Sequence, residues 1–124
     1  MKSDNFSIYA RLRSFRFAWN GIRIMLYREH NARVHLVATI AVALMAIVFG
    51  VTRQELLALL FAVGFVWMAE LLNTCVEKLS DFISRDRHPE IGFIKDMAAG
   101  AVLVAAVTAL ATGAIVFIPK LMAG

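Results

Sequence analysis

Three apolar stretches, residues 34–51, 56–76 and 97–118, constrain this chain more than any other feature. Each is close to the ~20 residues that a helix needs to cross the hydrocarbon core of a bilayer. Hydrophobic residues make up 60% of the chain, against about 45–50% in soluble domains. Because lipid cannot satisfy backbone polar groups, a spanning segment of this length must be helical. The sequence therefore predicts an all-α membrane protein with three transmembrane helices.

We expect residues 1–124 to form a single membrane domain, in which polar segments precede and connect the three apolar stretches. The polar run 50–55 is short enough to join the first two spans as an antiparallel hairpin. Residues 77–96 form a longer charged extension and loop before the third span. Residues 1–33 precede the first span and contain no apolar core of a secretory signal, so the spans are expected to stay as anchors.

The N-terminal segment, residues 1–33, has the pattern of an amphipathic helix lying on the membrane surface. Aromatic and aliphatic residues recur every three or four positions, and most arginines lie elsewhere around the helix. The alternative is a soluble helix packed on a protein core. The apolar positions include Tyr9, Leu12, Phe15, Trp19 and Ile22, and the basic ones are Arg11, Arg13, Arg16, Arg23 and Arg28.

The distribution of basic residues predicts how the chain is oriented. Residues 1–33 carry seven Lys or Arg and residues 77–96 carry four, whereas the 50–55 turn and the C-terminal tail carry one each. Basic residues concentrate on the cytoplasmic side of membrane proteins. We therefore expect the N-terminus and the 77–96 loop to face the cytoplasm, in a multi-pass protein of the inner membrane.

A polar face at the end of the second span is the main candidate for chemistry. Positions 70, 73, 77 and 81 fall within an arc of roughly 80° on a helix, and they carry Glu70, Asn73, Glu77 and Asp81. An ionisable residue at membrane depth is costly and is by default a functional candidate. Glu70 could serve as a general base, or it could be a carboxylate hydrogen-bonded between helices.

Other polar residues on the predicted cytoplasmic side could complete a site. Glu77 and Glu29 could hold Mg²⁺, which typically takes one or two protein carboxylates, or each could be a solvated or paired charge. Asp81 could pair with Arg85 or orient a cation, and Lys95 could contact nucleotide phosphates or simply anchor the third span. Asp86, Arg87 and His88 lie in a loop that could meet a nucleotide, whereas His35 is expected to be a hydrogen-bonded packing residue.

Several familiar motifs are absent from the sequence. It has no GxxxxGK loop, no GxGxxG and no Cys/His cluster with zinc spacing. The single cysteine, Cys75, excludes an intrachain disulfide and is expected to be buried and inert. If the chain uses ATP, it does so without the motifs of soluble kinases, and we expect no nucleic-acid partner.

The run from Ala69 to Asp81, AELLNTCVEKLSD, resembles the signature of the small prokaryotic diacylglycerol kinase family, roughly E-(hydrophobic)₂-N-[ST]-x₂-E-x₃-D. Further matches are W-x-G-x-R at 19–23, R-H-P at 87–89 and KDMAAGAVL at 95–103. The resemblance covers about residues 11–119. It implies a homotrimeric membrane kinase with sites between subunits, which moves the γ-phosphoryl group of Mg·ATP to a lipid hydroxyl.

The resemblance also assigns roles by position. Glu70 would be the general base, and Glu29 and Glu77 would hold Mg²⁺. The nucleotide would be contacted by Phe17, Glu29, Glu77, Asp86, Arg87, His88, Lys95 and Asp96. Support for the site and the substrate would come from Arg13, Trp19, Arg23, Arg33, Asn73, Asp81 and Ala99.

The acceptor lipid follows less directly from the sequence. Diacylglycerol kinases of Gram-negative bacteria tend to carry a Glu near the start of the first span, where this chain has Arg33-Val34-His35. That pattern and the R-H-P loop look like undecaprenol kinases, so we expect undecaprenol as acceptor, with diacylglycerol as the alternative. A small proton- or cation-coupled transporter and a purely structural subunit are the alternatives from other classes.

Overall fold

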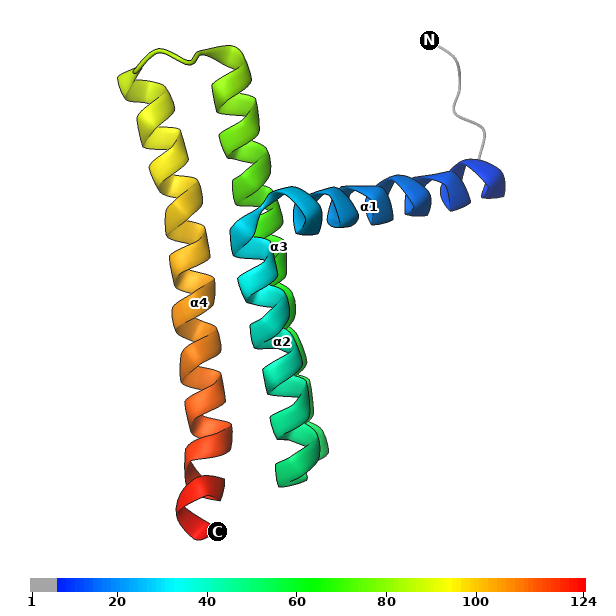
Figure 1. Ribbon diagram of the computed structural model, residues 1–124, viewed down its shortest axis with the longest axis vertical. Coiled ribbons are helices and arrows are strands. Elements are labelled where there is room, and N and C mark those ends of the chain that lie inside the picture. The colour runs from blue at the N-terminus through cyan, green and yellow to red at the C-terminus, as the bar shows by residue number, and fades with distance from the viewer. Residues whose placement is uncertain (1–6) are drawn as a thin grey trace. The chain divides into compact units, whose positions relative to one another are not determined.

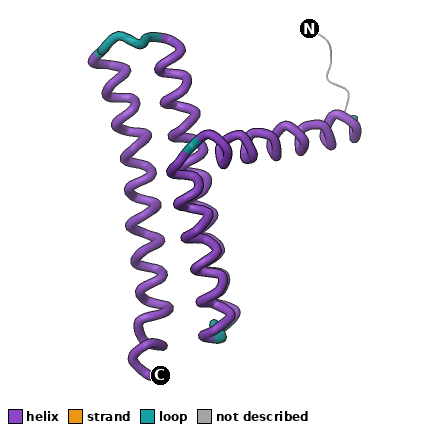
Figure 2. The backbone as a smooth tube through the Cα atoms, in the orientation of Figure 1, coloured by secondary structure: helices purple, strands orange, loops and turns teal. Residues whose placement is uncertain are grey.

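The computed structural model describes residues 7–124, and within that range every regular element is a helix (Figures 1 and 2). The helices are α1 (Ile8–Arg28), α2 (His30–Phe49), α3 (Arg53–Ile83) and α4 (Pro89–Ala123). Residues 1–6 of the predicted surface segment lie outside this description. The chain divides into two compact units, residues 1–34 and 35–124.

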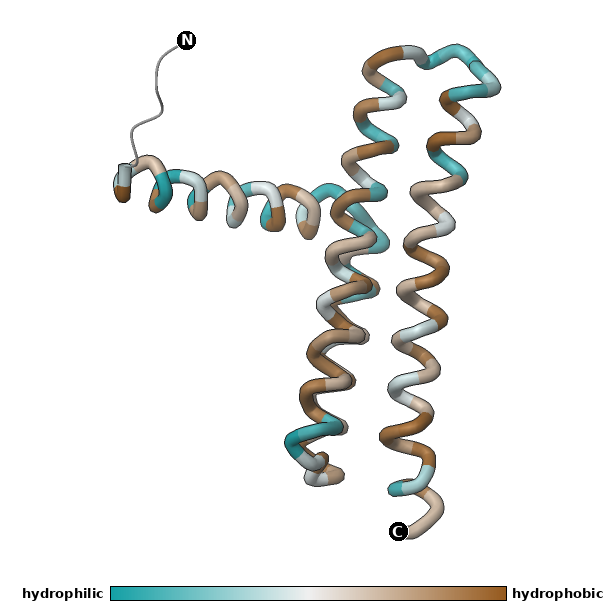
Figure 3. Tube along the Cα trace, turned by 180° about the vertical axis from the view of Figure 1, so that it is seen from behind, coloured by the Kyte–Doolittle hydropathy of each residue, from teal (hydrophilic) through white to brown (hydrophobic). Residues whose placement is uncertain are grey.

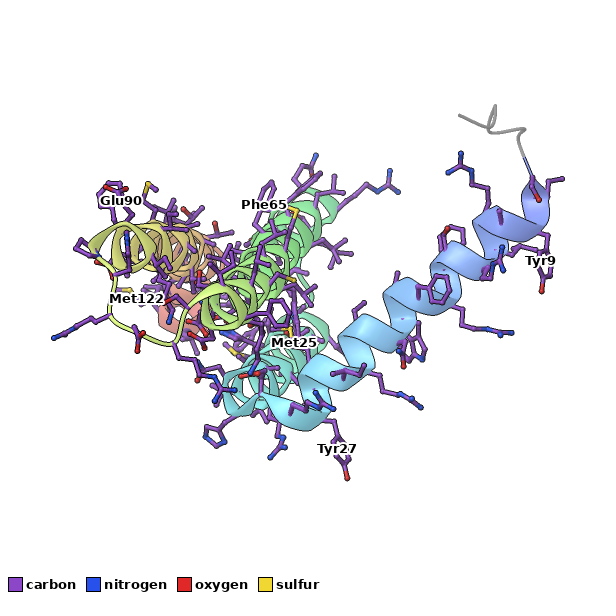
Figure 4. All side chains as sticks on the ribbon, turned by 90° about the horizontal axis from the view of Figure 1, so that it is seen from above. Tyr9, Met25, Tyr27, Phe65, Glu90 and Met122 are labelled. Carbon is purple, nitrogen blue, oxygen red and sulfur yellow. The ribbon has the colours of Figure 1, made fainter. Side chains whose placement is uncertain are left out.

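The first unit is built on α1, which has polar caps at both ends. Ser7 accepts a hydrogen bond from the Ala10 amide at the start, and the Glu29 amide donates to the Met25 carbonyl at the end. Glu29 has an extended backbone, so the predicted helix over 7–33 ends at Arg28. Tyr9 and Tyr27, near the two ends of α1, point away from its axis (Figure 4). That α1 lies on the membrane surface stays a prediction.

In the second unit, a tight turn joins α2 and α3 into the predicted hairpin. Gly50 adopts a positive φ of 62°, which glycine reaches without a Cβ clash. The amides of Gly50 and Val51 donate to the carbonyls of Ile47 and Ala46, which closes α2 in a Schellman motif. Thr52 then starts α3 through a reciprocal capping box with Glu55.

The core of the second unit lies at its turn end, where α2, α3 and α4 meet. Ala46, Leu59, Val116 and Phe117 are buried together there, and the rings of Phe49 and Phe117 are 6.0 Å apart. Nζ of Lys120 lies 3.0 Å from Oε1 of Glu55. This contact joins the end of α4 to the start of α3.

Helices α3 and α4 are longer than a bilayer requires, with 31 and 35 residues. Away from the turn they run side by side as a two-helix extension (Figure 1). The predicted extension and loop over 77–96 is mostly helical, because α3 continues to Ile83 and α4 begins at Pro89. Proline fits the first turn of a helix, where its missing N–H is not needed.

Hydrophobic residues run along much of the length of the long helices (Figure 3), and many of their large apolar side chains are exposed. Ile47, Leu110 and Ile115 each remain about three-quarters exposed, at 77%, 74% and 76%. Extended apolar surface of this kind is unfavourable in water. α2, α3 and α4 are each long and apolar enough to cross a membrane, which agrees with the prediction of three long apolar helices.

Candidate active site

Glu70 is buried in the second unit and hydrogen-bonded across the hairpin. Its side chain is only 8% exposed, and its Oε1 lies 2.8 Å from Nε2 of His35 on α2. Both the expected interhelical hydrogen bond of Glu70 and the packing role expected of His35 are therefore present. Within residues 7–124 no hydrogen bond engages Oε2 of Glu70, and this oxygen is not sealed from its surroundings. Because Oε1 is bonded to His35, Oε2 is the oxygen of Glu70 that could accept a proton.

A second pair of hydrogen bonds fixes α2 against α3 one turn away from Glu70. The Trp67 indole N–H donates to Oγ1 of Thr39 at 2.8 Å, and the Thr39 hydroxyl donates to the His35 carbonyl at 2.7 Å. The rings of His35 and Trp67 meet edge to face, with centroids 6.3 Å apart. The imidazole of His35 therefore contacts both Trp67 and Glu70 on α3.

The predicted polar face continues along α3 beyond Glu70. Nδ2 of Asn73 donates to Oε1 of Glu77 at 3.3 Å, while Oδ1 of Asn73 is buried with no partner in the described part of the chain. A buried acceptor of this kind ordinarily has a partner. Asn73 therefore offers an acceptor beside Glu77, which is itself exposed.

Asp81 and Lys95 connect the two helices of the extension. Nζ of Lys95 donates to Oδ1 of Asp81 at 2.8 Å. The sequence left two roles open for Asp81, pairing with Arg85 or orienting a cation. In the structure its partner is the cation Lys95. The hydrogen bond from Lys95, with its positive charge, lowers the pKa of the Asp81 carboxyl, and the same bond raises the pKa of Lys95. Both groups lie beyond the predicted spans.

The residues in and near the loop that are predicted to contact the nucleotide differ in exposure and in hydrogen bonding. Asp86, Arg87 and Asp96 are exposed, whereas Nδ1 of His88 accepts a hydrogen bond from the Glu90 amide and caps α4. Nearby, an open hollow of about 590 Å³ is lined by Lys78, Asp81, Phe82, Ile83, Ser84 and Arg85. Ala99 is exposed on α4. Nucleotide contacts at these positions stay predictions.

The remaining predicted site residues belong to the first unit. Phe17 and Trp19 are exposed, at 65% and 67%. The Arg13 guanidinium lies over the Tyr9 ring, and Arg23 donates to Asn20. Arg33 donates to the carbonyls of Leu26 and Tyr27, which gives it a structural role at the end of α1. That Glu29 shares a metal with Glu77 stays a prediction.

Sequence reasoning missed the pairing of His35 with Glu70, although a signal for it was present. Residues about equally far from the turn of an antiparallel hairpin lie at the same level, and counting outward from the 50–52 turn places His35 opposite Trp67, one helical turn from Glu70. The burial of Cys75 was also predicted wrongly, since its side chain is exposed.

Comparison with known proteins places this chain in a family. The sequence profile described as prokaryotic diacylglycerol kinase matches residues 16–117. An undecaprenol kinase of Bacillus subtilis (strain 168) is 35% identical over 109 residues, covering 88% of this chain and 89% of that protein. A diacylglycerol kinase of Synechocystis sp. is 34% identical over 110 residues, covering 88% of this chain and 63% of that protein. A diacylglycerol kinase of Escherichia coli (strain K12) is 30% identical over 96 residues, covering 77% and 79%.

The chain therefore belongs to the prokaryotic diacylglycerol kinase family. Together with its three apolar helices, this membership makes it a multi-pass membrane protein and a lipid kinase. The kinase hypothesis is thereby favoured over the transporter and structural-subunit alternatives.

The Asp81–Lys95 pair yields a prediction about the extension. In D81N, amides around residues 81–95 should exchange hydrogen faster, because the ion pair that joins α3 to α4 is lost. In the wild type the pair is complete at neutral pH. It should be lost only as pH falls through the lowered pKa of Asp81, below its ordinary value of 3.8.

Hydrogen exchange measured by mass spectrometry in detergent micelles at two pH values checks this prediction. E55Q is the matched control, because it breaks the contact with Lys120 at the opposite end of the same helices. Equal exchange at 81–95 in D81N and the wild type at neutral pH would show that the pair does not hold the extension together.

Proposed function

We propose that this chain transfers the γ-phosphoryl group of Mg·ATP to the hydroxyl of a membrane lipid alcohol, with undecaprenol as the acceptor. The observation that carries the proposal is the buried Glu70 carboxylate at the base of a polar helix face, in a member of a lipid kinase family. A buried carboxylate beside a lipid-facing span can reach a hydroxyl held at the membrane surface. Exposed groups further along α3 and α4 can reach a water-soluble nucleotide.

In this reaction Glu70 is the general base. Its Oε2 takes the proton of the lipid hydroxyl while the hydroxyl oxygen bonds to the γ-phosphorus. The bond from that phosphorus to the bridging oxygen breaks, and ADP leaves. Most of the catalysis of phosphoryl transfer comes from positioning and charge neutralisation. Lys95, oriented by Asp81, and the Asp86–His88 loop are proposed to contact the nucleotide.

The donor set of the site suits Mg²⁺. No cluster of three or more His, Cys, Asp or Glu side chains occurs in the described residues 7–124. This pattern disfavours a caged transition metal but fits Mg²⁺, which keeps waters and phosphate oxygens beside one or two carboxylates. We propose Glu77 and Glu29 as these carboxylates. When bound, the ion would neutralise negative charge on the transferred phosphate.

Two features support undecaprenol as acceptor. The Bacillus subtilis relative matched over 89% of its length is named undecaprenol kinase. The Arg33-Val34-His35 and Arg87-His88-Pro89 patterns point the same way. Diacylglycerol is the second candidate, because the Synechocystis and Escherichia coli relatives are named diacylglycerol kinases at similar identity.

The orientation and assembly of the enzyme belong to the same proposal. The excess of basic residues in 1–33 and 77–96 supports a cytoplasmic location for both segments in the inner membrane. The apolar side chains left exposed along α2 to α4 leave room for further helices to pack. We propose a homotrimer whose sites combine residues of neighbouring subunits.

An acceptor assay tests the proposed function. Purified protein in mixed micelles receives Mg·ATP and either undecaprenol or diacylglycerol, with E70Q as the blank. We expect Glu70-dependent phosphorylated product from both lipids, with the faster rate from undecaprenol. A faster rate from diacylglycerol would make the acceptor assignment wrong, and no Glu70-dependent product from either lipid would contradict the function.

The metal role of Glu77 gives a separate prediction. E77Q should need about tenfold more Mg²⁺, or more, to reach half of its maximal rate, because one anionic ligand is lost. E90Q is the matched control, since Glu90 is another exposed carboxylate of the extension. Activity titrated against Mg²⁺ at saturating ATP checks this, and an unchanged Mg²⁺ requirement in E77Q would remove Glu77 from the metal site.

A further inference from the structure

The contact between His35 and Glu70 holds a titratable partner that the reaction described above does not use. His35 comes from α2 and Glu70 from α3, and the two side chains are 22% and 8% exposed. A carboxylate removed from water needs a hydrogen-bond donor. In the part of the chain that the structure describes, Nε2 of His35 is the only group that bonds to Glu70.

The protonation state of this pair follows from the reaction. A general base must begin as a carboxylate, which has no hydrogen to donate. Nε2 of His35 must then carry the hydrogen and donate it to Oε1 of Glu70. This hydrogen bond holds the buried Glu70 carboxylate in one orientation, so that Oε2 points in one direction.

The surroundings of His35 hold its imidazole in place. The Trp67 ring meets it edge to face from α3. Thr39, one turn further along α2, accepts from the Trp67 indole and donates to the His35 carbonyl. A donor that aims a base must itself be fixed, because the geometry of proton transfer tolerates little displacement.

We propose that His35 is a positioning residue for the reaction, which aims the Glu70 carboxylate by donating its Nε2 hydrogen to Oε1. This inference rests on the proposed role of Glu70 as the base. His35 itself does not touch the lipid or the nucleotide. Its loss should therefore lower kcat and leave the KM for Mg·ATP unchanged.

The test compares H35Q with H35M. Gln and Met are similar in length, and both lose the ring contact with Trp67, but only Gln can donate an N–H to Glu70. We expect kcat to fall about ten- to a hundredfold in H35M, and most of that loss to be recovered in H35Q. Where H35M does not fold, H35F, which keeps an aromatic ring beside Trp67, takes its place.

A control variant separates aiming from simple packing. L59A removes a buried side chain from the core at the turn end, where α2, α3 and α4 meet, and leaves His35, Trp67 and Glu70 unchanged. Thermal unfolding measured with each rate should show L59A destabilised but retaining a kcat close to that of the wild type. An L59A variant as slow as H35M would show that helix packing, not the donor, matters.

The outcomes distinguish the two proposals. An inactive E70Q, with slow H35M and recovered H35Q, supports both. An inactive E70Q with H35M at the wild-type rate, or with H35Q as slow as H35M, overturns the role of His35 and leaves the proposed function standing. A fully active E70Q overturns the base itself, and the role of His35 fails with it.

Discussion

A carboxylate that is removed from water must be hydrogen-bonded, and Glu70 meets this requirement through its contact with His35 across the hairpin. The contact is possible only because the turn at Gly50 brings α2 back along α3. Trp67 and Thr39 hold the same two helices together one turn away. The position of the proposed base therefore depends on the register of the hairpin, which the Schellman motif and the Thr52 capping box fix at the opposite end.

Beyond this contact the polar face of α3 leads away from the apolar part of the helix. From Glu70 to Asp81 the helix rises roughly 16 Å, and along it the side chains change from buried to exposed. A lipid hydroxyl and a nucleotide need different surroundings, one apolar and one aqueous. In the proposed function, one helix could contact both the lipid and the nucleotide, because its polar face changes from buried to exposed. The Asp81–Lys95 pair joins the outer part of this helix to α4.

The sequence predicted the three spans and the hairpin well, because apolar length and a short polar turn report directly on them. It predicted helix ends poorly. Hydropathy marks where a helix leaves lipid and not where it stops, so α3 and α4 continue into the residues assigned to the loop. The break at Glu29 is a local change of the backbone with no glycine or proline to announce it.

The sequence predicted which site residues share one face of α3. It did not predict which residues of different helices contact each other. A 100° turn per residue is enough to place Glu70, Asn73, Glu77 and Asp81 on one face. The pairs between helices depend on how two surfaces pack, which a pattern within one segment does not encode. The contact of Lys95 with Asp81 was therefore not predicted. The proposed metal site draws on residues of both units, so it stays a prediction.

The central claim is that Glu70 acts on the chemical step and not on binding. Turnover by E70Q, measured beside its Mg·ATP affinity by calorimetry on the same sample, tests this claim most directly. The account predicts a loss of at least about a hundredfold in kcat, with nucleotide affinity unchanged. Near-normal turnover, or turnover lost together with nucleotide binding, would contradict it.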